Sequence, residues 1–451
     1  MENFDAIVIG AGQAGPGVAA ALAAEGRRVA IIEMAEVGGT CVNHGCKPTK
    51  ALRASATAAH QARRAGEYGV RTGEVTVDFP AAIKRVHDMT ADNRQSLSDY
   101  ITGMDGVELI YGQATLVTDP DGEQHAVTVG GRELSTPQVY LNLGARATVP
   151  HLPGIDSISV MTEVELLNLA ELPQHLIVVG AGYVGLEFAQ MFRRFGSEVT
   201  IIAGGGVAGR EDEDVSQILT DVFTDEGISI RTGRSGRVGP HADGLEVELE
   251  DGSVISGSHL LMATGRRSNS DLLGPDHGIE TDDRGFFTID GRYQTSVKGV
   301  WALGDVNGHG AFTHTAYQDS QILLEPPRTV DGRITVYAMF TDPPLGRVGM
   351  TTAEARESGR KVLKAEVPMS SVSRAILESE TIGVLRILVD ADTEEFLGAT
   401  ILGLHADDLV QIVSTCIQAG ITYPVLRDAL PIHPTMAEYL PSVLHALQPL
   451  D

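Results

Sequence analysis

The sequence predicts an α/β protein with two Rossmann-like dinucleotide-binding domains and a C-terminal α+β domain. Three observations support this prediction: an internal repeat, a glycine fingerprint in each copy of the repeat, and a change of pattern near the end of the chain. When the sequence is shifted by 170 residues, three glycines of one copy fall on three of the other: Gly10, Gly12 and Gly15 on Gly180, Gly182 and Gly185. After residue 326, strand-like runs at 334–340, 384–389 and 397–402 precede an apolar helix at 407–419.

Each copy of the repeat fits a βαβ unit. The first copy has strands at 6–9 and 28–32, and the second has strands at 176–179 and 198–202, with a helix-compatible stretch between the strands of each pair. In such a unit the first glycine allows a tight turn, the second lets the backbone approach a pyrophosphate, and the third lets the helix pack on the strand. The N–H groups at the helix start favour the phosphates. One fingerprint is weak evidence, but two in register indicate two dinucleotide sites.

The two units differ where a ribose is expected to bind. Glu33 lies 23 positions after Gly10, where a carboxylate can bind the hydroxyls of an adenosine ribose. The equivalent residue of the second unit is Ala203, which three glycines follow. Arg210 is the nearest downstream cation that could reach a 2′-phosphate. The preference of the second site between NAD and NADP therefore stays open.

A close pair of cysteines follows the first fingerprint. Cys41 and Cys46 are two of only three cysteines in the chain, which are too few for a disulfide framework. A close pair in a reducing compartment indicates redox catalysis or metal binding, and the lack of a second pair argues against a metal. The order of strand, glycine loop, helix, acidic residue and cysteine pair therefore indicates a flavin beside a redox-active disulfide.

The composition limits the possible partners. A formal net charge of -26 repels nucleic acid and anionic membranes, and no apolar run reaches the length of a membrane span. The segment 1–5 is acidic and enters a strand almost at once, which argues against a signal peptide. We therefore expect a cytoplasmic protein that binds neither nucleic acid nor membrane.

The pattern divides the chain into four expected regions. They are a first dinucleotide domain at 1–149, a second at 150–267, a return segment of the first domain at 268–326, and the C-terminal domain at 327–451. The first region also contains helix-compatible stretches at 51–64 and 79–104. The turn at 263–267 closes the second unit and matches the turn that closes the first.

Four motifs give the chain a resemblance to a known family. They are Gly-Gly-Thr-Cys-x4-Cys-x-Pro-x-Lys at 38–50, Ala-Thr-Gly-Arg at 263–266, Trp-Ala-Leu-Gly-Asp at 301–305 and His-Pro-Thr-Met-Ala-Glu at 433–438. With these motifs the chain resembles, over nearly its whole length, the pyridine nucleotide–disulfide oxidoreductases, which include glutathione reductase, dihydrolipoamide dehydrogenase and mercuric reductase. Within the family the chain is most similar to the mercuric-reductase-like and dihydrolipoamide-dehydrogenase-like subgroup, and the segment 337–350 carries this similarity.

The resemblance implies a fold and a direction of electron flow. It implies an FAD domain with an inserted NAD(P) domain, and an interface domain that forms a homodimer. In the family, NAD(P)H gives a hydride to the flavin, and two electrons then pass to the disulfide. The resemblance assigns Cys46 as the thiolate that faces the flavin and Cys41 as the cysteine that exchanges with substrate. A nearby base and a positive field would help, because the thiolate is the reactive form.

The resemblance also assigns roles to residues outside the cysteine pair. His433 would hold and return the thiol proton in the partner's active site, and Glu438 would orient it. Lys50 would lie near the flavin ring with Glu187 as its partner, and Tyr183 would be the aromatic gate of the nicotinamide pocket. The remaining residues expected to line the cofactor sites are Gly39, Thr40, Gly144, Gly265, Arg266, Gly304 and Asp305.

Departures from the relatives leave the acceptor open. The chain has no C-terminal cysteine pair, which disfavours mercuric reductase, and Ala203 disfavours dihydrolipoamide dehydrogenase. The first hypothesis is an NAD(P)H-dependent reductase of a small-molecule disulfide or of a thiophilic metal ion such as copper(II). Alternatives are a flavin-dependent dithiol oxidase that passes electrons to oxygen, a dihydrolipoamide dehydrogenase, and a non-catalytic flavoprotein that binds a partner. The roles of His44, Lys47 and Cys416 stay open, and no resident metal site is expected.

Overall fold

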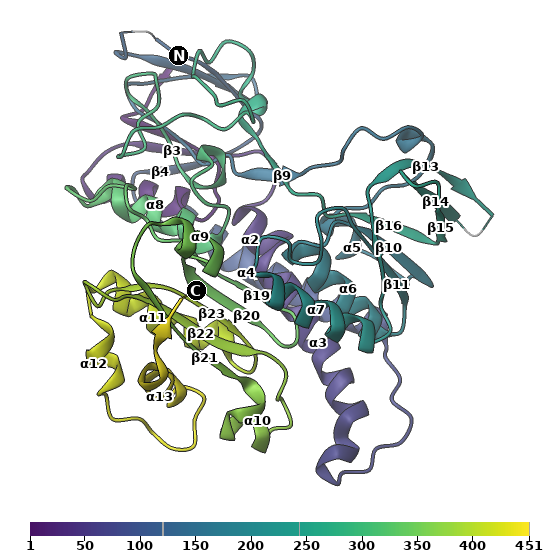
Figure 1. Ribbon diagram of the computed structural model, residues 1–451. Helices are drawn as coiled ribbons and strands as arrows, with labels where there is room; N and C mark the ends of the chain where they lie inside the picture. Colours follow the sequence, from purple (N-terminus) through teal and green to yellow (C-terminus); the bar gives the residue numbers. More distant parts are fainter. Residues whose placement is uncertain (120, 243, 451) are drawn as a thin grey trace.

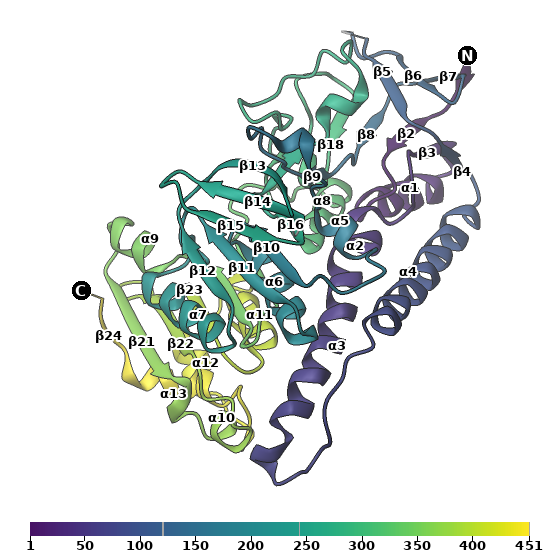
Figure 2. The same cartoon turned by 90° about the vertical axis from the view of Figure 1, so that its right-hand side faces the viewer.

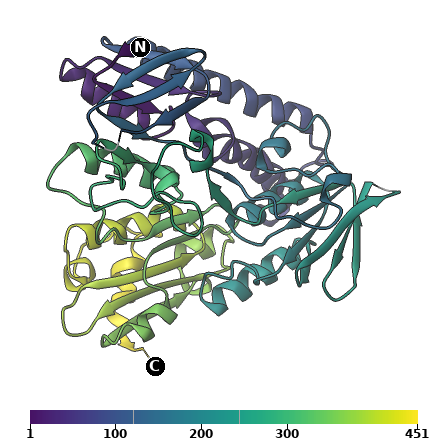
Figure 3. The same cartoon turned by 90° about the horizontal axis from the view of Figure 1, so that it is seen from above.

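The computed structural model describes residues 1–119, 121–242 and 244–450. Three regions pack against one another. The N-terminal end of the chain lies at the top of Figure 1, and a long purple helix of the same part reaches the lower right. The middle of the chain (teal) lies on the right, and the C-terminal part (yellow) lies at the lower left. The view from above shows the same three regions meeting at the centre of the molecule (Figure 3). No helix among the described residues is long and apolar enough to cross a membrane.

The first nucleotide-binding unit is built on a five-stranded parallel sheet. Its strands, in spatial order, are β18 (Val300–Ala302), β8 (Val139–Leu141), β2 (Ala6–Ile9), β3 (Val29–Glu33) and β4 (Val107–Tyr111). Strands β2 and β3 are buried along their whole length, as expected for parallel strands covered on both faces. The strand β18 brings a segment from late in the chain into the same sheet as the N-terminal strand.

Helices cover this sheet and extend from it. They are α1 (Gly15–Ala24), α2 (Gly39–Asn43), α3 (Cys46–Arg64), α4 (Phe79–Thr102) and α8 (Thr313–Leu324). The long helices α3 and α4 lie side by side (Figure 2). The helix expected at 51–64 begins five residues earlier, so that Cys46 is its first residue. The second cysteine therefore lies at a helix N-terminus, where a partial positive charge favours a thiolate.

A second sheet of the N-terminal part lies apart from the nucleotide-binding sheet. Its strands, in spatial order, are β1 (Glu2–Asn3), β7 (Arg132–Thr136), β6 (His125–Val129) and β5 (Ala114–Val117). Two short antiparallel strands, β9 (Ala145–Ala147) and β17 (Arg266–Ser268), join the first unit to the second. The chain passes outward through β9 and returns through β17. The boundaries at 149 and 267 stay predictions.

The second unit repeats the architecture of the first with four parallel strands. In spatial order they are β12 (Ser229–Thr232), β11 (Glu198–Ala203), β10 (His175–Val179) and β16 (His259–Met262). Its helices are α5 (Glu163–Leu166), α6 (Tyr183–Phe195) and α7 (Glu213–Asp225). An antiparallel sheet covers the other face with β13 (Ser235–His241), β14 (Gly244–Leu249) and β15 (Val254–Gly257). Both units thus present their glycine loops at the carboxyl ends of parallel strands, where such folds bind ligands.

The C-terminal domain is a six-stranded antiparallel sheet with helices. Its strands, in spatial order, are β19 (Val336–Met339), β20 (Leu345–Gly349), β23 (Phe396–Leu402), β22 (Val384–Asp390), β21 (Val362–Pro368) and β24 (Gln448–Pro449). Its helices are α9 (Thr352–Glu357), α10 (Ser373–Leu377), α11 (Ala406–Gln418), α12 (Tyr423–Arg427) and α13 (Tyr439–Val443). The helix α11 packs on β20 and β23 in one apolar core.

Three residues of α6 fasten the second unit to the C-terminal domain. Glu187 accepts a hydrogen bond from Phe340 N (2.9 Å), and Gln190 Oε1 accepts one from Asp342 N (2.8 Å). Arg194 Nη1 lies 2.7 Å from Asp342 Oδ2, and its side chain is only 5% exposed. Residues spaced three and four apart share one face of a helix, so the segment 340–342 is fixed along one ridge of α6.

Candidate active site

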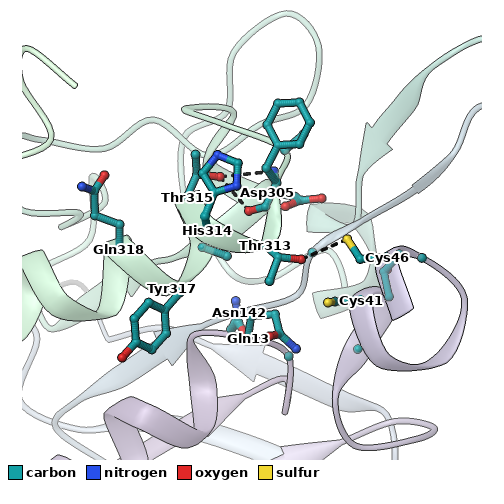
Figure 4. A pocket seen from close by; sticks show the side chains of 18 of the residues that line it. Gln13, Cys41, Cys46, Asn142, Asp305, Thr313, His314, Thr315, Tyr317 and Gln318 are labelled. Carbon is teal, nitrogen blue, oxygen red and sulfur yellow. Dashed lines mark hydrogen bonds between the residues drawn. The ribbon is translucent and has the colours of Figure 1, made fainter. Parts of the chain in front are cut away.

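One large cavity joins the first glycine loop to the cysteine pair. It has a volume of about 1340 Å³, and Glu33, Asp305, Cys41, Cys46 and Tyr183 are among the residues that line it. Figure 4 shows Cys41 and Cys46 on one side of this cavity and Thr313 opposite them. The structure therefore brings to one space residues that are far apart in the sequence.

The first glycine loop is shaped by close contacts with its own backbone. A Cβ at Gly10 would lie 2.2 Å from the carbonyl oxygen of Asn142, and a Cβ at Gly15 would lie 2.2 Å from the carbonyl oxygen of Gly10. Gly15 N donates to Asn142 Oδ1 (3.1 Å), and a Cβ at Gly12 would lie 2.8 Å from that oxygen. Only glycine fits at these positions, so the backbone N–H groups of the loop are held close to the cavity.

Glu33 lines the cavity, and two backbone hydrogen bonds fix the orientation of its carboxylate. Its Oε2 accepts a hydrogen bond from Ala11 N and its Oε1 accepts one from Ala35 N, both at 2.9 Å. The residue is 8% exposed and lines the cavity. A carboxylate held by two backbone donors loses little further freedom when it accepts ribose hydroxyls.

Asp305 lies toward the middle of the cavity, in a short 3₁₀ helix after β18. Burial raises the pKa of Asp305, and the charge of Arg266, whose Nε is 3.8 Å from Oδ2, partly offsets this rise. The preceding Gly304 has φ of +73°, and its N–H donates to Asp319 Oδ2 (2.7 Å). Asp319 is 1% exposed, and so the turn that presents Asp305 is anchored in the core.

These features fit FAD. The cavity is long, with a carboxylate at the ribose end, a glycine loop and helix N-terminus beside the pyrophosphate, an acid in the middle and a sulfur at the far end. Gly39 and Gly144, with φ of +56° and +69°, also line it. Thr40 Oγ1 accepts a hydrogen bond from Arg266 Nη2 (3.3 Å), which ties the cysteine segment to the linker from the second unit.

The cysteine pair is present as two thiols with different environments. Cys41 is buried in α2, whereas the Cys46 sulfur faces the cavity and lies 3.3 Å from Thr313 Oγ1. The hydrogen bond from Cys41, the hydrogen bond with Thr313 and the charge of Lys50 together lower the pKa of Cys46 to about 5. The hydrogen bond between the two cysteines, together with burial, raises the pKa of Cys41. These shifts favour a reduced pair in which Cys41 keeps the proton and Cys46 is the thiolate.

Lys50 and Glu187 form an ion pair between the two nucleotide-binding units. Lys50 lies one turn after Cys46 on α3, and its Nζ is 2.8 Å from Glu187 Oε2 on α6. Glu187 is 4% exposed, and Lys50 Nζ also lies 4.3 Å from the centre of the Phe340 ring. A buried carboxylate needs such partners, and the pair fixes the lysine charge beside the cavity.

The second glycine loop has the same shape as the first. Cβ atoms at Gly180 and Gly185 would lie 2.3 Å from Ala263 O and 2.0 Å from Gly180 O. Gly182 is the residue before α6, whose first residue is Tyr183. Gly265, with φ of +112°, lies in the turn that precedes Arg266.

The ribose end of this second unit is open. Ala203 is 2% exposed, and the three glycines after it are exposed. A Cβ at Gly204 would lie 3.1 Å from Arg234 Cγ, so this arginine crosses the loop where an acid stands in the first unit. Arg210 and Arg231 are exposed near the same strand ends, and none of these three arginines has an ion pair with a described residue. The arrangement favours an anion.

The structure does not bring His433 to the cysteines of its own chain. His433 is 73% exposed, lies in the loop between α12 and α13, and is not among the described residues that line the cavity. Its Nδ1 is 2.9 Å from Glu438 Oε2. Since a carboxylate only accepts, Nδ1 carries the proton and Nε2 is free to take another. The neighbouring Leu430 and Ile432 are 97% and 77% exposed, so the whole loop projects from one subunit.

The residues of open role lie around the site or apart from it. His44 is half-buried, and burial lowers its pKa. Lys47 Nζ donates to Asn93 Oδ1 (2.6 Å), and so its charge points toward α4. Cys416 is buried in α11, and burial raises its pKa. No group of three or more metal-binding side chains lies together among the described residues.

Sequence reasoning missed several residues of this site. They are Asn142, Asp319, Thr313, Phe312, Tyr337, Phe340 and Arg234. Each comes from a segment outside the glycine and cysteine motifs, and no spacing in the sequence relates it to them.

Comparison with known proteins agrees with this geometry. The pyridine nucleotide-disulphide oxidoreductase family matches residues 4–320, and the dimerisation domain of the same family matches residues 335–443. The probable pyridine nucleotide-disulfide oxidoreductase RclA of Escherichia coli (strain K12) is 35% identical, with 98% of each chain covered. The mercuric reductase of Streptomyces lividans is 32% identical, over 97% of this chain and 95% of that one.

Solved structures give the same assignment. The HOCl-induced flavoprotein disulfide reductase RclA from Escherichia coli superposes with a TM-score of 0.87 at 35% identity, covering 98% of this chain and 99% of that one. Its Cu(II) complex gives a TM-score of 0.89 at 34% identity, covering 99% and 100%. LpdA from Mycobacterium tuberculosis, at 24% identity and a TM-score of 0.90 with 99% of each chain covered, shares the fold. The chain belongs to the pyridine nucleotide-disulphide oxidoreductase family and is a flavoprotein disulfide reductase of the RclA and mercuric reductase type, with a dimerisation domain.

Proposed function

We propose that the protein takes electrons from NAD(P)H and passes them through FAD and the Cys41–Cys46 pair to a disulfide or a thiophilic metal ion. The observation that carries this proposal is the asymmetry of the cysteine pair: Cys46 is exposed to the cavity beside Thr313 and Cys41 is buried. The lowered pKa of Cys46 and the raised pKa of Cys41 agree with a thiolate at Cys46 and a proton on Cys41. FAD, when bound, supplies a two-electron carrier between the nicotinamide and this pair. Residues Gly10, Glu33 and Asp305 would hold it.

The residues suggest how a substrate disulfide is reduced. The raised pKa of Cys41 means that a base must take its proton before it attacks. We assign this base to His433 of the partner subunit, through Nε2. The Cys41 sulfur bonds to one substrate sulfur, the substrate S–S bond breaks, and the released thiolate takes the proton. The Cys46 thiolate then attacks Cys41, which restores the disulfide and releases the second substrate sulfur as a thiolate that takes a proton from solvent.

The acceptor class follows from the same two sulfurs. A thiophilic metal ion would bind the sulfurs and take one electron, so two ions would be reduced for each dithiol oxidised. Because an Escherichia coli relative was solved as a Cu(II) complex, copper(II) is the first metal acceptor to test. The donor we propose is NADPH, since Ala203 offers no acid to a ribose and Arg234 crosses Gly204.

An anaerobic titration tests the proposal. The purified protein with FAD is titrated separately with NADPH and NADH while the visible spectrum is followed. Bleaching of the flavin, with growth of a long-wavelength band from the Cys46 thiolate, supports the reductase and identifies the donor. Reduction by neither nucleotide but by a dithiol would instead support the alternative of a dithiol oxidase, for which the open second site is the one favourable observation.

A further inference from the structure

Beside the nicotinamide gate lies a stack of aromatic rings. The ring of Tyr183 is 5.8 Å from the ring of Phe312, centre to centre, with their planes tilted by 40°. Phe312 in turn stacks on Tyr337 at 5.7 Å with only 4° between the planes, and on His314 at 5.3 Å. All four side chains line the cavity. The orientation of Tyr183 therefore depends on Phe312, and that of Phe312 on Tyr337.

Tyr337 is fixed at its other end by the second unit. Its hydroxyl donates to Glu211 Oε1, and Arg347 Nη1 lies 3.2 Å from Glu211 Oε2. The side chains of Glu211 and Arg347 are 6% and 5% exposed. Burial and the nearby carboxylate raise the pKa of Tyr337, so its hydroxyl keeps the proton that it donates. This contact joins the first strand of the C-terminal domain to the segment before α7.

Glu211 ends the loop at which the adenosine part of the nicotinamide cofactor is expected. The loop 204–212 begins with three exposed glycines, which the buried Val207 and Ala208 follow. Ala208 N donates to Ala181 O (2.9 Å). The end of the loop is held by the C-terminal domain, because Arg347 Nη1 donates to Arg210 O (3.4 Å) and Thr352 Oγ1 donates to Asp212 Oδ2 (2.7 Å). The second unit therefore holds the middle of the loop, and the C-terminal domain holds the end that leads into α7.

We infer that Tyr337 is a positioning residue for both ends of the nicotinamide cofactor. Through Glu211 it holds the adenosine-binding loop, and through Phe312 it backs the Tyr183 gate. This inference rests on the proposed function, because it assumes that a nicotinamide cofactor enters beside Tyr183. A positioning role differs from a purely structural one, because substitution of Tyr337 should weaken nicotinamide binding and leave the reduction of the cysteine pair by a dithiol intact.

Two variants separate the two contacts of Tyr337. Tyr337→Phe keeps the ring and removes the hydroxyl, and Tyr337→Leu removes both. The first measurement is calorimetric binding of NADP⁺ and of 2′,5′-ADP, which lacks the nicotinamide, to the oxidised protein with FAD. Both variants should bind 2′,5′-ADP about tenfold more weakly, the change expected when a hydrogen bond to a charged group is lost. Equal affinity for 2′,5′-ADP in wild type and Tyr337→Phe would overturn the link through Glu211.

Stopped-flow reduction of the flavin tests the gate. At saturating NADPH, Tyr337→Leu should reduce the flavin about tenfold more slowly than Tyr337→Phe, because only the leucine variant loses the ring behind Phe312. Reduction by dithiothreitol, which enters at Cys41 and Cys46, should be unchanged in both variants. Equal NADPH rates in the two variants, or an equal loss with dithiothreitol, would overturn the positioning role of the ring.

Controls keep this inference apart from the proposed function. Tyr100→Phe changes an exposed tyrosine on α4 and should match the wild type in every measurement. Glu211→Ala combined with Tyr337→Phe should bind 2′,5′-ADP no more weakly than Glu211→Ala alone, because either substitution removes the same hydrogen bond between the two side chains. If neither nucleotide reduces the wild type, the proposed function and this inference are overturned together. If a nucleotide reduces the wild type and the Tyr337 variants behave like the wild type, this inference alone is overturned.

Discussion

The two glycine-loop units have the same backbone but opposite ribose ends. At the first, Glu33 is buried and its carboxylate is held by two backbone N–H groups. At the second, Ala203 offers no polar atom, and the glycines after it are exposed beside Arg234. The difference matches the proposed roles, since FAD stays bound through every cycle while the nicotinamide must leave after each one. The two units therefore share the phosphate-binding turn and differ at the ribose end, and we expect this difference to set how long each cofactor stays bound.

The largest effect is expected from matched substitutions in the two turns. Gly10→Ala and Gly180→Ala each place a Cβ 2.2–2.3 Å from a carbonyl oxygen at positive φ. Gly10→Ala should abolish FAD retention, measured by flavin absorbance after purification. Gly180→Ala should retain FAD and lose more than about a hundredfold in NADPH-driven reduction, while reduction by dithiothreitol persists. Loss of FAD from Gly180→Ala would contradict the proposal that the first unit binds FAD and the second binds the nicotinamide cofactor.

A smaller effect is expected from the acid of the first unit. Glu33→Ala removes the acceptor for a ribose and leaves the N–H groups of Ala11 and Ala35 without their partner. FAD affinity should fall about thirtyfold or more, as for loss of charged hydrogen bonds, in a fluorescence assay of FAD release. Glu25→Gln, an exposed acid on the same unit that pairs with Arg27, is the matched control and should retain FAD. An unchanged FAD affinity in Glu33→Ala would show that this acid is not what distinguishes the first ribose site from the second, where Ala203 stands.

The open ribose end predicts a change in donor preference. Arg234→Ala should lower kcat/KM for NADPH about tenfold and leave that for NADH within about twofold, because only NADPH carries a 2′-phosphate. Steady-state kinetics with both donors measures this ratio. Arg237→Ala removes a nearby arginine that already pairs with Glu248, and should leave the ratio unchanged. An equal loss of kcat/KM with both donors would show that Arg234 does not bind the 2′-phosphate.

The smallest effect concerns the ion pair that joins the two units. Lys50→Met removes a positive charge that lowers the pKa of Cys46, so this pKa should rise above about 5. A thiolate is present above its pKa and lost below it, and the long-wavelength band of the reduced protein should therefore disappear at a higher pH. Lys47→Met is the matched control and should leave the midpoint unchanged, because the amine of Lys47 donates to Asn93 Oδ1 on α4. A midpoint unchanged by Lys50→Met would assign the thiolate to the hydrogen bonds of Cys41 and Thr313 alone.

The local pattern of the chain was enough to predict most of the fold. Strands β2 and β10 followed from apolar runs before a glycine turn, and the cysteine pair followed from its motif, because these depend on contacts within a few residues. The family assignment and the fold class made from the sequence are confirmed by the comparisons. The individual site roles of Cys46, His433 and Tyr183 stay predictions, and the experiments above test them.

Contacts between distant segments were decided by the tertiary structure alone. The sequence placed Cys46 in a motif, but only the fold brought Thr313 within 3.3 Å of its sulfur. It placed Tyr183 after a glycine loop, but only the fold stacked Phe312 and Tyr337 behind it. The physical reason is that turn and strand preferences act through neighbouring residues, whereas the position of a side chain in the site depends on how whole domains pack. The sequence by itself therefore determined the two turns and the redox pair, and the packing of three domains decided what surrounds them.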